Sequence, residues 1–82
     1  QFQQVFVLIS CDKNMIFFVM EELKNIPTVI DVKETEGMYD IVFVMKSDSV
    51  EDIKQTIANK IRVLDGIRST LTLFDINNST KL

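Results

Sequence analysis

Two hydrophobic periods alternate along this chain, and together they predict six secondary-structure elements. Residues 4–10 are almost continuously β-branched, aliphatic or aromatic, which predicts a buried strand. In residues 14–25, apolar side chains recur at steps of three and four, which is typical of an amphipathic helix. Asn14 is suited to cap that helix, and Pro27 prevents its continuation.

The next two segments predict a β-hairpin. Residues 28–35 and 38–46 are rich in β-branched and aromatic side chains. Between them stands Gly37, which we expect to adopt a positive φ in the turn.

A second helix and a last strand complete the pattern. Asp48 or Ser49 is the predicted helix cap, with an acidic residue three positions later as its capping-box partner. The apolar stripe of this helix ends at Asp65-Gly66. Residues 67–76 predict the fourth strand, and residues 77–82 form a polar tail that we expect to fray. The apolar stripe consists of Val50, Ile53, Ile57, Ile61 and Leu64.

This order, βαββαβ, predicts a ferredoxin-like α+β fold in a single domain of residues 1–82. Its four-stranded antiparallel sheet carries both helices on one face, and the first and third strands are central. Both central strands are apolar on both faces, although only one face meets the helices. We therefore expect the second face to pack on the sheet of another copy, giving a sheet-to-sheet dimer; the alternative is an exposed hydrophobic face. Residues 15–20 of the first helix are apolar all round, which suggests a further oligomeric contact or a helix end covered by a loop.

Composition excludes several classes of function. The net charge is −3 without a basic cluster, so direct binding of nucleic acid is not expected. No apolar run approaches the roughly 20 residues of a membrane span, and a single cysteine without a signal-like segment predicts a cytoplasmic protein. Without histidine, and with only Cys11, a metal site lacks ligands, and we expect a buried thiol there. No catalytic or cofactor-binding motif is present, so neither an enzyme nor a cofactor is predicted.

Two short segments offer chemistry suited to holding a small zwitterion. Backbone at Gly37 can approach a ligand closely, Asp40 can meet an ammonium group, and three hydroxyls near residue 70 can meet a carboxylate. Several of these residues also have a purely structural interpretation: Asp40 as an acceptor for turn backbone, Tyr39 as an ordinary strand aromatic, and the threonines as good strand formers. The candidate binding residues are Gly37, Tyr39, Asp40, Ser69, Thr70 and Thr72.

The motifs G-x-Y-D-I from Gly37 and G-I-x-S-T-x-T from Gly66 stand in an order and spacing that resemble one family. The chain is similar to the effector-binding domain of the Lrp/AsnC family, called the RAM domain, over about residues 5–76. The resemblance implies dimers assembled into octamer- or decamer-like rings, with amino acids bound between dimers near the hairpin turn and the last strand. It implies that the six candidate residues bind this ligand, and we therefore expect Asp40→Ala to abolish the response without unfolding the protein.

Two departures from the family pattern affect the expected output. No segment resembles the helix-turn-helix of the family's transcription regulators, so the resemblance implies a stand-alone module or a fragment. Its signal would then pass through a partner protein, such as a full-length family regulator. The loop before the first helix, residues 12–14, lacks the glycine that is frequent there in the family.

Three alternatives remain open at the level of sequence. The first is a ligand-free structural oligomerisation partner of a full-length regulator. The second is an ACT-like regulatory domain, which would pair side by side. The third is a small dimeric ferredoxin-like enzyme, disfavoured by the missing histidine although Tyr39 or a carboxylate could act alone.

Overall fold

The computed structural model describes residues 3–74, and it contains the predicted order of elements. The strands are β1 (Gln3–Cys11), β2 (Val29–Glu34), β3 (Ile41–Ser47) and β4 (Ile67–Phe74). The helical segments are η1 (Lys13–Met15, a 3₁₀ turn), α1 (Ile16–Lys24), α2 (Val50–Thr56) and η2 (Ile57–Ile61, a π-helical segment). The last two residues of the predicted fourth strand and the predicted tail lie outside the described residues.

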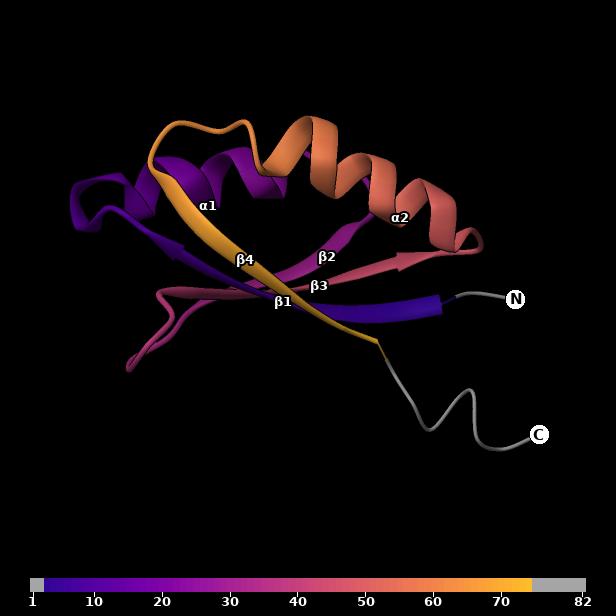
Figure 1. Ribbon diagram of the computed structural model, residues 1–82, viewed down its shortest axis with the longest axis horizontal. Coiled ribbons are helices and arrows are strands. Elements are labelled where there is room, and N and C mark those ends of the chain that lie inside the picture. The colour runs from indigo at the N-terminus through magenta and orange to yellow at the C-terminus, as the bar shows by residue number, and fades with distance from the viewer. Residues whose placement is uncertain (1–2, 75–82) are drawn as a thin grey trace.

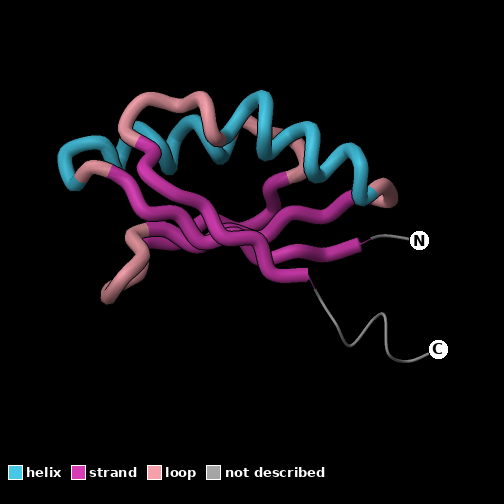
Figure 2. Tube along the Cα trace, in the orientation of Figure 1, coloured by secondary structure: helices cyan, strands magenta, loops and turns pink. Residues whose placement is uncertain are grey.

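The sheet is antiparallel with strand order β2-β3-β1-β4, so the first and third strands are central, as predicted. Both helices cover the same face of this sheet, and the other face has no covering layer among the described residues (Figures 1 and 2). The ferredoxin-like prediction is thereby confirmed for the single chain.

The core lies between the helices and one face of the sheet. Alternate residues of β1 and β3 point into it because successive side chains of a strand point to opposite faces. The central strands supply Val5, Val7, Ile9, Cys11, Ile41, Phe43 and Met45, and the helical layer supplies Val19, Leu23, Ile26, Ile53, Ile57 and Ile61.

The opposite sheet face, which we call the open face, remains largely apolar. Phe6, Leu71 and Leu73 are 40%, 41% and 46% exposed. The strand register brings these side chains together, since Phe6 lies opposite Leu73 and Leu8 lies opposite Leu71. The apolar residues of the open face are Phe6, Leu8, Val42, Val44, Leu71 and Leu73.

Several predicted boundaries differ from those of the structure. The first helix is not capped by Asn14, which lies inside η1 and makes no side-chain cap. Ser49 caps the second helix, since its Oγ accepts a hydrogen bond from the Asp52 N–H at 3.1 Å. Strand β3 begins at Ile41 rather than at residue 38, and residues 38–40 belong to the turn.

Candidate functional site

The two motif segments lie at the same end of the sheet, on either side of β1. Ile9 of β1 pairs with Ile41 of β3 on one side and with Thr70 of β4 on the other. The β2–β3 turn, the loop after β1 and the turn before β4 accordingly gather at this end (Figures 1 and 2). Two segments that are far apart in the chain thus share one edge of the fold.

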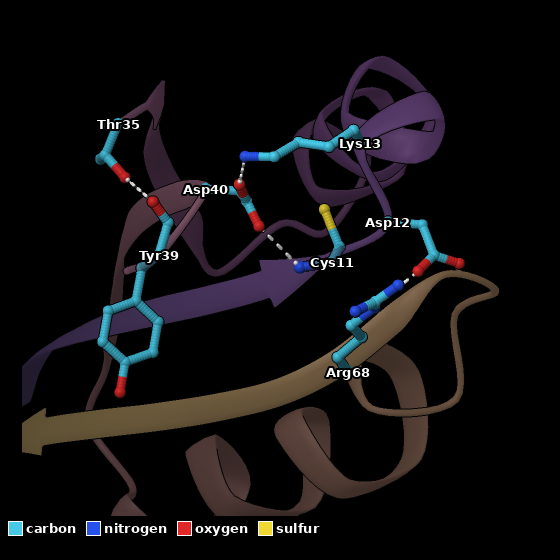
Figure 3. A network of polar contacts seen from close by, with 7 residues as sticks. All are labelled: Cys11, Asp12, Lys13, Thr35, Tyr39, Asp40 and Arg68. Atoms are coloured by element: carbon cyan, nitrogen blue, oxygen red, sulfur yellow. Dashed lines mark hydrogen bonds and ion pairs between the residues drawn. The ribbon is translucent and has the colours of Figure 1, made fainter. Parts of the chain in front are cut away.

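Asp40 fastens the hairpin to the end of β1. Asp40 is buried, with only 6% of its surface exposed. One carboxylate oxygen, Oδ2, accepts the Cys11 N–H at 2.9 Å, and Oδ1 accepts Lys13 Nζ at 2.7 Å (Figure 3). The backbone adds two bonds, from the Asp40 N–H to the Ile9 carbonyl and from the Thr35 N–H to the Asp40 carbonyl, both at 2.8 Å. The carboxylate that was predicted to bind a ligand therefore already accepts hydrogen bonds from two groups of the protein.

A second pair of contacts joins the loop after β1 to the turn before β4. The Asp12 N–H donates to the Gly66 carbonyl at 2.8 Å, and Arg68 Nε donates to Asp12 Oδ1 at 2.6 Å (Figure 3). Residues 11–13, which we call the linking segment, thus hold both motif segments at once.

The linking segment and Arg68 are absent from the site residues predicted from sequence. The available signal was the adjacent acid and base at Asp12 and Lys13, directly after a strand, with complementary charges at Asp40 and Arg68. That signal is weak without the strand order, because only the topology shows that the two partners flank β1.

The electrostatics of the linking segment follow from these contacts. The hydrogen bond from Lys13, followed by the one from the Cys11 N–H, lowers the pKa of Asp40 despite its burial. The hydrogen bond and charge of Asp40 raise the pKa of Lys13. Burial, and then the charges of Asp40 and Asp12, raise the pKa of the Cys11 thiol, so this cysteine is a neutral core residue as expected.

Asp40→Asn is expected to lower Tm at pH 7 by about 5 °C, because the amide retains an acceptor for Cys11 but loses the charged pair with Lys13. Since folding lowers the pKa of Asp40, its contribution is complete above the unfolded value of about 3.9 and is lost as the pH falls through the folded value. Urea unfolding between pH 2 and 7 should therefore show less acid destabilisation in the variant. The exposed Asp31→Asn is the matched control; identical pH profiles for wild type and Asp40→Asn would contradict this role.

The other candidate residues fall into two groups. Gly37 has the predicted positive φ of 104° and lies exposed at the hairpin tip. The Tyr39 ring points away from the Asp40 carboxylate, while its backbone carbonyl accepts the Thr35 hydroxyl at 2.7 Å (Figure 3). On β4, the register places Thr70 and Thr72 on the helix side and Ser69 on the open face.

A polar cleft of about 370 Å³ lies beside the first half of β4. Its size is within the range of small-molecule sites. Ser69 and Thr70, which are neighbours in the sequence, both line this cleft, and Thr72 lines an adjoining hollow. The candidate residues of the hairpin line neither the cleft nor the hollow. The cleft is lined by Arg62, Ile67, Arg68, Ser69 and Thr70. Within residues 3–74 no group of acidic and cysteine side chains is arranged to hold a metal ion, and no helix is long and apolar enough to cross a membrane.

Comparisons with known proteins find the same fold. TTHA0845 from Thermus thermophilus is 29% identical, with a TM-score of 0.85 over 89% of this chain and 91% of that one. Escherichia coli AsnC is 24% identical, with a TM-score of 0.84 over 90% of this chain and 50% of AsnC. The transcriptional regulator NMB0573 from Neisseria meningitidis, solved as an L-Met complex, is 14% identical, with a TM-score of 0.77 over 89% of this chain and 49% of that one. No curated protein matches the sequence.

The fold defines the class as a ferredoxin-like α+β domain, with a polar cleft beside its edge strand β4. The Lrp/AsnC ligand binding domain matches residues 4–80, nearly the whole chain, and this protein belongs to that family. The resemblance drawn from the two motifs is confirmed.

Proposed function

We propose that this protein is a regulatory module that binds an amino acid and passes the signal to partner proteins that control transcription. The observation that carries the proposal is the convergence of both motif segments on one linking segment, beside a polar cleft. Hydroxyls of Ser69 and Thr70 are suited to a ligand carboxylate. Membership of a ligand-binding family and the fold shared with a regulator solved with L-Met support this function.

We further propose that the working form is a homo-oligomer built on a sheet-to-sheet dimer, with the ligand between dimers of a larger ring. The open face supports the dimer, because a contiguous apolar patch of this kind is uncommon on a monomer. At the start of α1, Phe17 and Phe18 are 76% and 40% exposed, so no loop of the described chain covers them. They support a second contact between dimers.

Asp40 acts in this proposal through displacement. Its Oδ1 is already paired with the ammonium group of Lys13, whose side chain is 82% exposed. A ligand ammonium group reaches the Asp40 carboxylate by replacing the ammonium group of Lys13. The exchange substitutes one ammonium cation for another. The existing pair equally favours a second candidate function, a ligand-free oligomerisation partner in which Asp40 serves structure alone.

The test is a thermal-shift screen of the protein against the twenty amino acids at millimolar concentration. A ligand at about 100 times its Kd adds about 2.7 kcal/mol to the native state, which raises Tm by about 10 °C or more in a domain of this size. We expect a shift for one or a few amino acids, and its loss in Thr70→Val, which removes one hydroxyl from the cleft.

Thr28→Val is the matched control for that variant. The buried Thr28 hydroxyl has no hydrogen-bond partner in the described part of the chain. The Thr28 carbonyl accepts the Lys46 N–H at 2.9 Å, so this residue lies at the other end of β3 from Asp40. Its removal should leave the ligand response unchanged. No shift with any amino acid would overturn the proposed function and favour the structural partner.

A further inference from the structure

Two irregularities of the backbone lie at the polar cleft. Arg68 is the extra residue of the first, and Arg62 directly follows the second. The first is a bulge in β4. Ser10 lies opposite Ser69, whereas the next residue, Cys11, lies opposite Ile67, so Arg68 is an extra residue without a partner across the ladder. A bulge of this kind turns a side chain out of the regular alternation.

The second irregularity is the π-helical segment η2. The Arg62 N–H donates to the Ile57 carbonyl, five residues earlier, at 2.9 Å. The wider turn keeps Ile57 and Ile61 in the core and places Arg62 at the exposed end of the segment. There Arg62 lines both the cleft and the adjoining hollow next to Thr72.

π-Helical segments and β-bulges cost regular hydrogen bonds, and both are frequent at functional sites. Here they lie on different elements, η2 and β4, and converge on one cleft. Two independent departures from regular structure thereby place two arginines on the lining of the same cleft.

The charges around the cleft do not balance. Asp12 engages Arg68 through Nε, which fixes the guanidinium plane and compensates one positive charge. Within residues 3–74, Arg62 makes no ion pair, and none of the residues that line the cleft is acidic. The cleft is therefore a locally positive site on a chain whose net charge is −3.

We propose that this cleft selects an amino acid with a second carboxylate, of the aspartate or glutamate type. The inference rests on the proposed function and names its ligand class. A hydroxyl of Ser69 or Thr70 binds one carboxylate, and the planar guanidinium groups of Arg62 and Arg68 bind the other, since arginine recognises a carboxylate with paired hydrogen bonds. A dicarboxylic amino acid carries a net charge of −1, which matches the one uncompensated positive charge.

The experiment compares near-isosteric pairs by isothermal titration: L-glutamate with L-glutamine, and L-aspartate with L-asparagine. We expect one acid to bind at least tenfold more tightly than its amide. Arg62→Gln should abolish that preference. Lys60→Gln, which removes the same charge from an exposed residue of η2 outside the cleft, should retain it. Circular dichroism establishes that both variants fold.

The outcomes separate this inference from the proposed function. Amides that bind as tightly as acids, or a preference that survives in Arg62→Gln, would overturn the ligand class and leave amino-acid sensing intact. Absence of binding by all twenty amino acids would overturn the proposed function itself, and the ligand class with it.

Discussion

Gly66→Ala is expected to destabilise the native state by about 3 kcal/mol, a large part of the roughly 5–15 kcal/mol typical of a domain. Gly66 has a φ of 90°, where a side chain costs about 1–2 kcal/mol. Its new Cβ would lie 2.7 Å from Met15 Cβ and 2.8 Å from Met15 Cγ. Since these atoms are close to the η1 backbone, relief requires that η1 move, at a cost of about 1–3 kcal/mol more.

Gly37→Ala is the matched control. Its φ of 104° imposes similar backbone strain, but no atom lies within 4 Å of the added Cβ. Urea unfolding at equal protein concentration should show a loss of about 1–2 kcal/mol for this variant, clearly less than for Gly66→Ala. Equal losses in the two variants would show that the packing of Gly66 against Met15 contributes nothing.

Leu71→Glu is expected to convert the proposed dimer to monomers. Leu71 lies opposite Leu8 within the open face, away from the helices, so its carboxylate would be buried only in the dimer. We expect the dimer to weaken about 100-fold or more while each chain remains folded. Analytical ultracentrifugation measures the assembly, and far-UV circular dichroism measures the fold.

Val63→Glu provides the comparison for this variant. Val63 is 66% exposed and lies in the turn after η2, outside the sheet, so its replacement introduces the same charge away from the open face. The assembly should remain that of the wild type. If Leu71→Glu also leaves the assembly unchanged, the open face is not the dimer contact.

The central sheet could be predicted because its residues favour the strand conformation and alternate between the two faces of the sheet. β-Branched and aromatic side chains favour strands, and successive side chains alternate between the two faces, so Val7 and Phe43 could each be grouped with the same-face residues of their strands. Which group enters the core could not be predicted, because both faces of these strands are apolar. The burial of Cys11 was predicted on another ground, because the chain has no histidine that could activate the thiol or complete a metal site.

The π-helical segment could not be read from the stripe alone. Ile53, Ile57 and Ile61 are spaced by four, and in an α-helix each such step rotates about 40° away from the preceding side chain. The wider turn of η2 offsets that drift and buries all three. The strict four-residue spacing was the available signal for a π-helical segment. A regular α-helix, however, accommodates the same rotation of side chains around its axis over two such steps.

The candidate site was predicted in part. The sequence identified the hairpin and last-strand segments, and the topology brings them to one edge. The hydrogen-bond partners of Asp40 could not be predicted, because Lys13 and Cys11 are distant from it in the sequence and approach it only in the folded chain. Asp40→Ala, expected from sequence to leave the fold intact, would also remove the acceptor of a buried N–H, so Asp40→Asn is the more informative variant.

The position of Tyr39 has a spectroscopic consequence. The chain contains one tyrosine and no tryptophan, so its ultraviolet emission at tyrosine wavelengths comes from a single side chain. That side chain is half-buried in the hairpin, next to the residue that binds the linking segment. The unmodified protein therefore carries an intrinsic fluorophore at the junction of β3 and β1, and its quantum yield and anisotropy report on this hairpin alone.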